Sequence, residues 1–372
     1  MGKRLLIAGG GTGGHLFPGM AVAEEWLAAE PDNEVLFVGS GSGIETQILP
    51  SAGYPFKTIR VRPLVGQGRL EQVKGLLLLP LSLFQALKVI RGFKPDAALG
   101  VGGYVAGPVL LAAWLLRLPT AIQEQNALPG STNLILGGIV DRVFANLEYS
   151  RPAFAKADRR GRLTVCGNPI RRAIRKKIEE GRGHPAANHR VCLLVIGGSQ
   201  GARKLNYLVL EAMLHLKPLH DAIKVFHQTG SGDVLQIVST YARLDIRARV
   251  QEFITDMAGA LCEADVILSR AGAGAVAEIA LAGKPSILVP FPYAAGDHQT
   301  INAKAVVAAG GALMFQESGL SGLMLAEALR PLLTDAEKRR EMGEKVHALA
   351  VPDAAETIAR GLYELLAAKG KA

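Results

Sequence analysis

The 372-residue sequence has little of several features that would assign it to a familiar class. It has three cysteines, Cys166, Cys192 and Cys262, and no CxxC pair, which excludes a disulfide framework and a cysteine zinc site and is typical of a reducing compartment. No Asp-x-Asp occurs, so the carboxylates that usually bind a diphosphate through a metal ion are missing. Aromatic residues make up 5% and do not interleave with the basic residues, so nucleic acid is not an expected partner. We therefore expect neither a metal ion nor a cofactor.

Long apolar runs are missing as well. The longest apolar segments, residues 75–84 and 105–116, are shorter than the ~20 residues that a membrane-spanning helix needs. The N-terminal apolar run ends in glycines after five residues, so no signal peptide is expected. These observations favour a location in the cytosol.

The composition is that of a folded α/β protein. Apolar residues make up 49% of the chain and charged residues 20%, and the length favours two domains rather than one core. Short apolar runs alternate with helical patterns, which indicates βαβ units with parallel sheets. The expected strands are residues 4–8, 35–38, 97–99, 191–196 and 266–268.

A glycine-rich turn, GGGTGGH at residues 9–15, follows the first expected strand and precedes an expected helix over residues 21–29. Glycine allows a tight turn that brings backbone N–H groups to one point at the positive end of a helix dipole, where phosphate or another anion binds. The turn matches the dinucleotide fingerprint GxGxxG. However, the second strand ends without the acid that this fingerprint needs, and no GxxxxGK[ST] occurs. Both familiar nucleotide-cofactor sites are therefore disfavoured.

Two more turns follow expected strands of the first domain: LGVGGY at residues 99–104 and QEQN at residues 123–126. Open α/β sheets bind ligands at the carboxyl ends of their strands, so we expect these turns and the first one to form one rim. His15, at the start of the first helix, is either a structural histidine or a general base beside an anion site. Residues 151–177, with ten basic residues and one acid, are typical of a linker.

The second domain is expected to begin at strand 191–196, which a second glycine turn, GGSQG at residues 197–201, follows. A further turn, SRAGAG at residues 269–274, opens a helix over residues 275–282 that ends at Gly283-Lys284-Pro285. Small residues at a helix start allow a pyrophosphate to approach the N–H groups.

Three charged residues lie near these turns. Glu278, one turn into the helix, either binds both hydroxyls of a ribose or is a solvated carboxylate near the positive dipole end. Arg270 and Arg171 are candidate counter-charges for a diphosphate, because without a metal the helix dipole and arginine must neutralise it.

A basic, leucine-rich segment lies in the first domain. Between Lys57 and Arg117 there are nine basic residues and two acids, and the run LLLLPLSLF occupies Leu76 to Phe84. Apolar side chains surrounded by Lys and Arg suit a helix that lies on an anionic membrane surface. The alternative is a core helix with a solvated basic face.

Seven motifs, in this order along the chain, resemble those of the MurG family, the bacterial N-acetylglucosaminyltransferases that convert lipid I to lipid II in peptidoglycan synthesis. They are GGGTGGHLFPG, LGVGGYVAGP, EQNALPGSTN, GNPIR, VIGGSQGAR, SRAGAGAVAEIALAGKPSILVPFPYAAGDHQTINA and VPDA. The resemblance implies a GT-B fold, with two Rossmann-like domains that face each other across a cleft. The expected domains are residues 1–165 and 166–348, with a C-terminal helix at about 349–372 that packs back on the first.

The resemblance also implies substrates and a location. The donor is UDP-GlcNAc, the acceptor is undecaprenyl-diphospho-MurNAc-pentapeptide (lipid I), and transfer to the C4 hydroxyl inverts the anomeric centre. A lipid-linked acceptor favours the interpretation of Leu76–Phe84 as a membrane-surface segment. The expected location is peripheral, on the cytoplasmic side of the inner or plasma membrane, with other cell-wall synthesis proteins as further partners.

Site residues are carried over by motif. Donor binding is implied for Thr12, Gly13, Gly14, Asn126, Arg171, Ser199, Ile254, Ala273, Gly274, Ala275, Val276, Ala277, Glu278 and Gln299. Acceptor binding is implied for Gly103 and Tyr104, and His15 and Glu124 are the candidates for the catalytic base, with His15 preferred. Ala275 departs from the family pattern, which often has a hydroxyl residue there, so the backbone N–H groups alone remain for the diphosphate.

Other functions fit the sequence less well. Another UDP-sugar-dependent GT-B lipid glycosyltransferase is the nearest alternative. UDP-GlcNAc epimerases typically carry an Arg-Pro-Glu type sequence at the first turn, which is missing here. A NAD(P) oxidoreductase is disfavoured by the missing acid after the second strand, and a non-catalytic nucleotide-binding membrane adaptor would not need His15.

Overall fold

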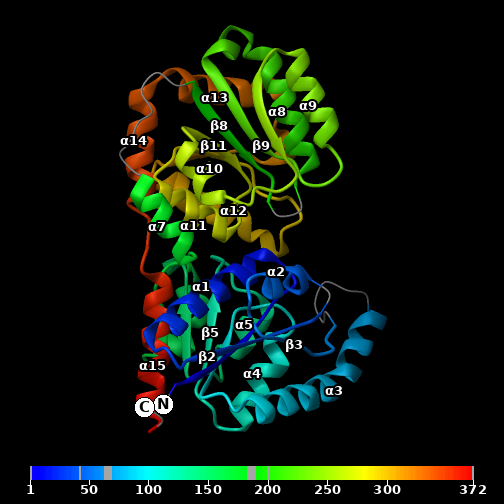
Figure 1. The fold of residues 1–372 in the computed structure, drawn as a ribbon, viewed down its shortest axis with the longest axis vertical. Coiled ribbons are helices and arrows are strands. Elements are labelled where there is room, and N and C mark those ends of the chain that lie inside the picture. Colours follow the sequence, from blue (N-terminus) through cyan, green and yellow to red (C-terminus); the bar gives the residue numbers. More distant parts are fainter. Residues whose placement is uncertain (1, 42, 63–68, 182–189, 199–200, 371–372) are drawn as a thin grey trace. The chain divides into compact units, whose positions relative to one another are not determined.

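The computed structural model describes residues 2–41, 43–62, 69–181, 190–198 and 201–370, apart from the side chains of residues 69–74 and 76. The chain forms two compact units, Met1–Arg172 with Pro352–Ala372, and Ala173–Val351 (Figure 1). The first unit extends to Arg172, beyond the boundary expected at residue 165, and Arg172 is tied to helix α1 (Gly13–Ala29). The Arg172 backbone N–H donates to Glu24 and its guanidinium pairs with Glu25.

The first unit contains a parallel sheet of seven strands in the order β3-β2-β1-β4-β5-β6-β7. The strands are β1 Arg4–Ala8, β2 Glu34–Gly39, β3 Phe56–Thr58, β4 Ala97–Gly100, β5 Thr120–Glu124, β6 Arg142–Ala145 and β7 Leu163–Val165. The helices are α1, α2 Glu45–Ser51, α3 Arg69–Phe93, α4 Ala106–Leu115, α5 Ser131–Leu136, α6 Ala155–Asp158 and α15 Ala354–Ala368, with a 3₁₀ helix η1 at Glu148–Phe154.

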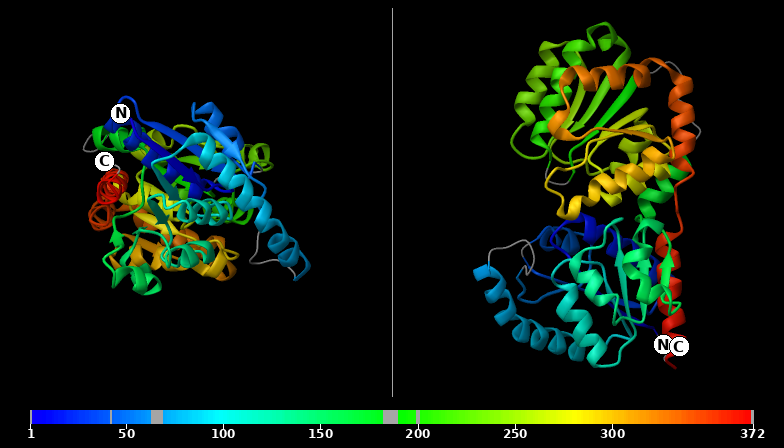
Figure 2. Two further views of the ribbon diagram at one scale, coloured as in Figure 1. Left: turned by 90° about the horizontal axis from the view of Figure 1, so that it is seen from below. Right: turned by 180° about the vertical axis from the view of Figure 1, so that it is seen from behind.

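Alternation along the strands divides this core into two layers. Leu5 and Ile7 of β1 pack with α1, α2 and α15, whereas Leu6 and Ala8 pack on the opposite face with α3 and α4. Helix α15, drawn in red, lies beside α1, and Trp26 of α1 stacks on Tyr363 at 4.5 Å between ring centroids. On the other face α3 runs alongside α4, as Figure 2 shows. Both faces are therefore buried, as expected of a parallel sheet.

The second unit contains a parallel sheet of six strands in the order β10-β9-β8-β11-β12-β13. The strands are β8 Val191–Ile196, β9 Ile223–Gln228, β10 Arg247–Gln251, β11 Val266–Ser269, β12 Ser286–Leu288 and β13 Ala312–Met314. The helices are α7 Arg172–Gly181, which begins at the unit boundary, α8 Arg203–His215, α9 Val234–Arg243, α10 Met257–Glu263, α11 Ala273–Ala282, α12 His298–Ala308, α13 Gly322–Thr334 and α14 Ala336–His347. Short 3₁₀ helices are η2 Lys217–Ala222, η3 Ala295–Asp297 and η4 Glu317–Gly319.

The α/β class with two parallel sheets is confirmed, and all five expected strands are present within one residue at either end. The predicted end of α11 is also confirmed, because Gly283 takes the left-handed conformation (φ 64°) that ends a helix. Two expectations are wrong. Helix α1 begins at Gly13, not at residue 21, so the last glycines of the first turn are already helical. Residues 151–177 are not a linker, because they contain the end of η1, then α6, β7 and the start of α7.

A polar network lies inside the core of the second unit. The His227 ring, fully buried on β9, contacts the Tyr241 hydroxyl at Nδ1 (2.9 Å) and the Asn206 side-chain oxygen at Nε2 (3.1 Å). The Asn206 amide in turn donates to the Thr229 carbonyl (3.0 Å). Burial lowers the pKa of His227 to about 3, so the ring is neutral at pH 7.

This neutral histidine predicts a pH dependence. The unfolded chain binds a proton at His227 below its ordinary pKa of 6.5, whereas the folded chain does so only near pH 3, so stability is lost as the pH falls through this window. Between pH 7.5 and 5.5 the group should reduce the free energy of unfolding by about 1.4 kcal/mol. Urea unfolding followed by circular dichroism should therefore show a smaller pH dependence in His227→Gln. Equal pH dependence in both proteins would contradict this assignment.

Candidate active site

The turn that opens α1 packs directly on the turn after β4. A Cβ added to Gly103, where φ is +78°, would lie 2.9 Å from the Gly10 carbonyl oxygen, and one on Gly9 would overlap the Val101 side chain. The third turn joins them, because the Gln125 side chain donates to the Val101 carbonyl (2.7 Å). The three turns at the carboxyl edge of this sheet therefore lie together, as the sequence predicts.

A carboxylate that the sequence analysis missed binds the first turn. Glu45, the first residue of α2, is fully buried, and its side chain accepts from the Gly11 N–H (2.9 Å) and the Ser40 hydroxyl (2.8 Å). Burial raises the pKa of Glu45, but these hydrogen bonds outweigh it and hold the pKa below its ordinary value. The carboxylate is therefore charged, and the Gly11 N–H, expected to face a ligand anion, has an internal partner.

His15 lies in the first turn of α1 and is half-buried. The Thr12 hydroxyl is 3.3 Å from His15 Nδ1, and a Cβ on Gly102 would lie 2.9 Å from His15 Nε2. The imidazole therefore packs against the backbone of the second turn, where no side chain larger than that of glycine fits. Tyr104, also in this turn, is 46% exposed. His15, Thr12 and the acceptor candidates Gly103 and Tyr104 are thus brought to one rim.

Glu124 has a different environment from the one expected of a carboxylate facing an acceptor. It is 1% exposed, and its oxygens accept from the backbone N–H groups of Asn126 (2.9 Å) and Gly130 (3.1 Å) and from the Asn133 amide (2.9 Å). Burial raises its pKa, against these hydrogen bonds, which lower it. The geometry is that of a side chain that shapes its own loop, including the donor candidate Asn126.

Arg171 and Arg270, the two candidate counter-charges, differ in their contacts. Arg171 belongs to the first unit, where its guanidinium lies 4.9 Å from the ring centroid of Phe17 on α1. Arg270 is buried, and its guanidinium donates to the carbonyls of Val289 and Pro290 (3.1 Å each) and pairs with Glu317. These contacts hold the turn after β12 and the buried carboxylate in place, and the expected role of Arg270 as a counter-charge for a diphosphate stays a prediction.

The start of α11 is an open helix N-terminus. The first N–H bonded within the helix is that of Val276, which donates to the Gly272 carbonyl. The N-cap residue, Gly272, has no side chain that could cap the preceding N–H groups of Ala273, Gly274 and Ala275. Val276 and Ala277 follow in the same turn, and Glu278 is half-buried one turn in. Such a terminus favours an anion, and with alanine at 275 the backbone alone supplies the donors.

The remaining donor candidates of the second unit are Gln299, at the start of α12, and Ile254, in the turn after β10. The Gln299 side-chain oxygen accepts from the Phe291 N–H (2.9 Å) in the turn after β12. Ile254, 2% exposed, follows β10, and its N–H donates to Gln228, a residue that the sequence analysis did not select. Ser199 lies outside the described residues.

No group of three or more His, Cys, Asp or Glu side chains among the described residues is arranged to hold a metal ion. None of the helices within the described part of the chain has the length and apolar character needed to cross a membrane.

Family models match both units. The glycosyltransferase family 28 N-terminal domain matches residues 5–145, and the glycosyltransferase family 28 C-terminal domain matches residues 192–358. A protein of Anaeromyxobacter sp. (strain Fw109-5) is 46% identical over 98% of this chain and 93% of its own length. It is named UDP-N-acetylglucosamine--N-acetylmuramyl-(pentapeptide) pyrophosphoryl-undecaprenol N-acetylglucosamine transferase, as is a Myxococcus xanthus protein that is 45% identical over 98% of this chain and 93% of its own length.

The crystal structure of Acinetobacter baumannii MurG matches this chain with a TM-score of 0.76 and 31% identity. The match covers 97% of this chain and 99% of the MurG chain. The chain belongs to the MurG family. A UDP-GlcNAc 2-epimerase from Neisseria meningitidis, bound to UDP-GlcNAc, has a TM-score of 0.67 over 97% of this chain and 100% of its own, but with 14% identity it shows a shared fold alone. Membership of the MurG family confirms the resemblance and the GT-B fold class inferred from the motifs.

The contact of Glu45 with the first turn predicts a stability effect. In Glu45→Gln one side-chain oxygen becomes an NH₂ group, so one of these partly buried hydrogen bonds, to Gly11 or to Ser40, loses its acceptor. The free energy of unfolding of the first unit should fall by about 1–3 kcal/mol. Urea unfolding followed by tryptophan fluorescence reports on this unit, because Trp26 and Trp114 both belong to it.

The matched control is Glu30→Gln, since Glu30 is exposed and such changes usually stay within about 0.5 kcal/mol. A Glu45→Gln protein as stable as Glu30→Gln would show that the carboxylate does not hold the turn.

Proposed function

We propose that this chain transfers GlcNAc from UDP-GlcNAc to the C4 hydroxyl of MurNAc in undecaprenyl-diphospho-MurNAc-pentapeptide, giving lipid II. The observation that carries the proposal is the similarity, over nearly the full length, to relatives whose names state this transfer. The two glycine-rich sites support it, since one offers an open helix N-terminus and the other a histidine on a rim of three turns.

The second unit is assigned the nucleotide part of the donor. The α11 N-terminus, from Ala273 to Ala277, takes the diphosphate through backbone N–H groups, Glu278 takes the ribose hydroxyls, and the Ile254 backbone takes the uracil. The other donor assignments inferred from the motifs are Gln299 and Asn126 for the sugar, Thr12, Gly13 and Gly14 for the sugar and diphosphate, and Arg171 and Ser199 for the diphosphate.

The first unit is assigned the acceptor and the base. In a single in-line displacement the acceptor C4 oxygen bonds to C1 of GlcNAc as the bond from C1 to the UDP oxygen breaks, so the anomeric centre inverts from α to β. The hydroxyl proton passes to His15, and the charge that develops on UDP is stabilised by the α11 dipole and by Arg171. His15 is preferred over Glu124 because both Glu124 oxygens already accept within their own loop.

The base assignment predicts a kinetic effect. His15→Ala should lower kcat by ~10²–10⁴, the usual contribution of a positioned base, with the affinity for UDP-GlcNAc nearly unchanged. Transfer of labelled GlcNAc to a lipid I analogue gives kcat and the product linkage, and calorimetry gives the affinity. His215→Ala, an exposed histidine on α8, is the matched control. Near-normal kcat in His15→Ala removes His15 from the mechanism, and an α-linked product removes the single displacement.

We also propose that α3 places the enzyme on the anionic cytoplasmic surface of the inner or plasma membrane as a peripheral protein. Leu77 is 76% exposed and Phe84 63% exposed, while Leu79 and Leu81 are partly exposed on the same helix. The exposed basic residues Lys88 and Arg91 lie further along it, and Trp114 on the neighbouring α4 is 45% exposed. Apolar side chains beside Lys and Arg combine the two attractions that hold a protein on anionic lipid. Other cell-wall synthesis proteins are further proposed partners.

The membrane assignment predicts an effect that depends on the acceptor. Replacing Leu77, Leu79 and Phe84 with Ser should reduce sedimentation with phosphatidylglycerol vesicles and activity on a long-chain acceptor, while activity on a short-chain soluble acceptor persists. Leu235→Ser, which changes a leucine on α9 that is more exposed than any of these three, should alter none of these properties. Equal loss on both acceptors would show that α3 supports the fold instead.

A further inference from the structure

One buried side-chain amide connects two turns of the second unit. Gln228, the last residue of β9, is 2% exposed. Its Nε2 donates to the Gly198 carbonyl (2.8 Å), and its Oε1 accepts from the Ile254 N–H (3.0 Å). Both ends of the amide are therefore bonded to backbone atoms, one of the donor candidate Ile254 and the other of the glycine turn at residues 197–201, whose donor candidate is Ser199.

The strand order explains why one side chain reaches both turns. Strand β9 lies between β8 and β10, and Gln228 is in register with Ile196 on one side and Gln251 on the other. The turn after β8 contains Gly198 and the turn after β10 contains Ile254. All three strands are parallel, so their carboxyl ends meet at one edge, and the Gln228 side chain lies between the two turns.

Two contacts fix the backbone next to Gln228, at Thr229. The buried network of His227 and Asn206 holds the Thr229 carbonyl. Gly201 packs so closely on this strand end that an added Cβ would overlap the Thr229 carbonyl oxygen.

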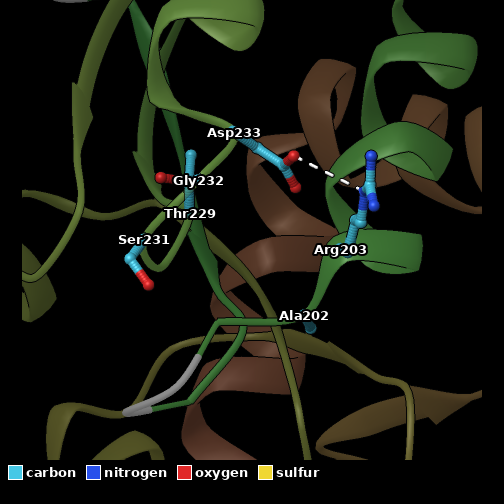
Figure 3. Close-up of a pocket in the computed structure, with 6 residues that line it drawn as sticks. All are labelled: Ala202, Arg203, Thr229, Ser231, Gly232 and Asp233. Atoms are coloured by element: carbon cyan, nitrogen blue, oxygen red, sulfur yellow. Dashed lines mark ion pairs between the residues drawn. The ribbon is translucent and has the colours of Figure 1, made fainter.

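The loop that continues from Thr229 to Asp233 lines a polar cavity of about 230 Å³ together with the start of α8. In it Asp233 faces Arg203 at 3.6 Å (Figure 3). Because these contacts hold the end of β9 in place, the Gln228 side chain can fix the positions of the Gly198 and Ile254 turns.

We infer that Gln228 is a positioning residue that couples the base turn at Ile254 to the phosphate turn at Gly198, so that uridine and diphosphate bind as one unit. The inference rests on the proposed function, because it takes UDP as the ligand of these turns. The Gly198 carbonyl, held by the Gln228 amide, is kept from turning toward an incoming phosphate, whose charge it would repel. The same amide sets the orientation of the Ile254 peptide that faces the base. Because both turns are oriented before UDP binds, less binding free energy is lost in ordering them.

Coupling is tested by comparing uridine with UDP. Gln228→Leu keeps the volume but removes both hydrogen bonds, and we expect the Kd of UDP to rise about tenfold, as for loss of hydrogen bonds of ordinary strength. The Kd of uridine should rise by less, so the ratio of the uridine Kd to the UDP Kd falls. A role limited to stability would lower the fraction of folded protein and leave this ratio unchanged. Gln251→Leu, at the register position on β10, is the matched control.

A second variant covers the case in which Gln228→Leu does not fold. Gln228→Glu keeps an acceptor for the Ile254 N–H but presents a repelling oxygen to the Gly198 carbonyl, so uridine binding should persist while UDP binding weakens. Calorimetry on the full chain, with circular dichroism to check the fold, measures both. A wild-type chain that does not bind UDP defeats the proposed function. A wild-type chain that binds UDP, with an unchanged ratio in the folded Gln228 variants, overturns the coupling alone.

Discussion

Contact of backbone with backbone between neighbouring turns is the constraint on which both candidate sites depend. At the carboxyl edge of the first sheet, the turn with Gly103 lies against the Gly10 carbonyl, and in the second sheet Gly201 lies against Thr229. A Cβ at either glycine would push the two turns apart, and the hydrogen bonds between neighbouring turns would lengthen and weaken. The parallel strands bring the turns to one edge, and glycine allows them to touch.

Buried polar side chains then fix these turns from inside. Glu45, Glu124, Gln228 and Arg270 each bind backbone groups of a turn that follows a strand, and each is nine-tenths buried or more. Hydrogen bonds offset part of the desolvation cost of such groups, and moving a turn would break them, so the turns are held in one arrangement. The start of α11 differs, because its N-cap residue, Gly272, has no side chain that could cap the first N–H groups. The contrast separates turns that are organised internally from the terminus that is assigned the diphosphate.

The sequence predicts the local features well, because they depend on neighbouring residues. The apolar runs at residues 4–8 and 191–196 correspond to β1 and β8, and Gly283 ends α11. The hydrogen-bond partners of the polar side chains could not be predicted from the sequence, because they are distant along the chain. The dinucleotide fingerprint places an acid at the end of the second strand. Glu45 lies further along the chain, and yet its carboxylate accepts from the Gly11 N–H. Arg270 has the charge of a phosphate ligand, and only its contacts with Val289, Pro290 and Glu317 reveal its structural role.

In the proposed function the second unit recognises a uridine diphosphate sugar through backbone groups and Glu278. Calorimetric titration of the full chain with UDP-GlcNAc, UDP and ADP, in the wild type and in Glu278→Ala, tests it most directly. The account predicts binding of UDP-GlcNAc and UDP, much weaker binding of ADP, and a loss of about 1–3 kcal/mol for both uridine ligands in the variant, since the contact is to the ribose. Binding of ADP as tight as that of UDP, or an unchanged affinity for UDP in Glu278→Ala, would contradict it.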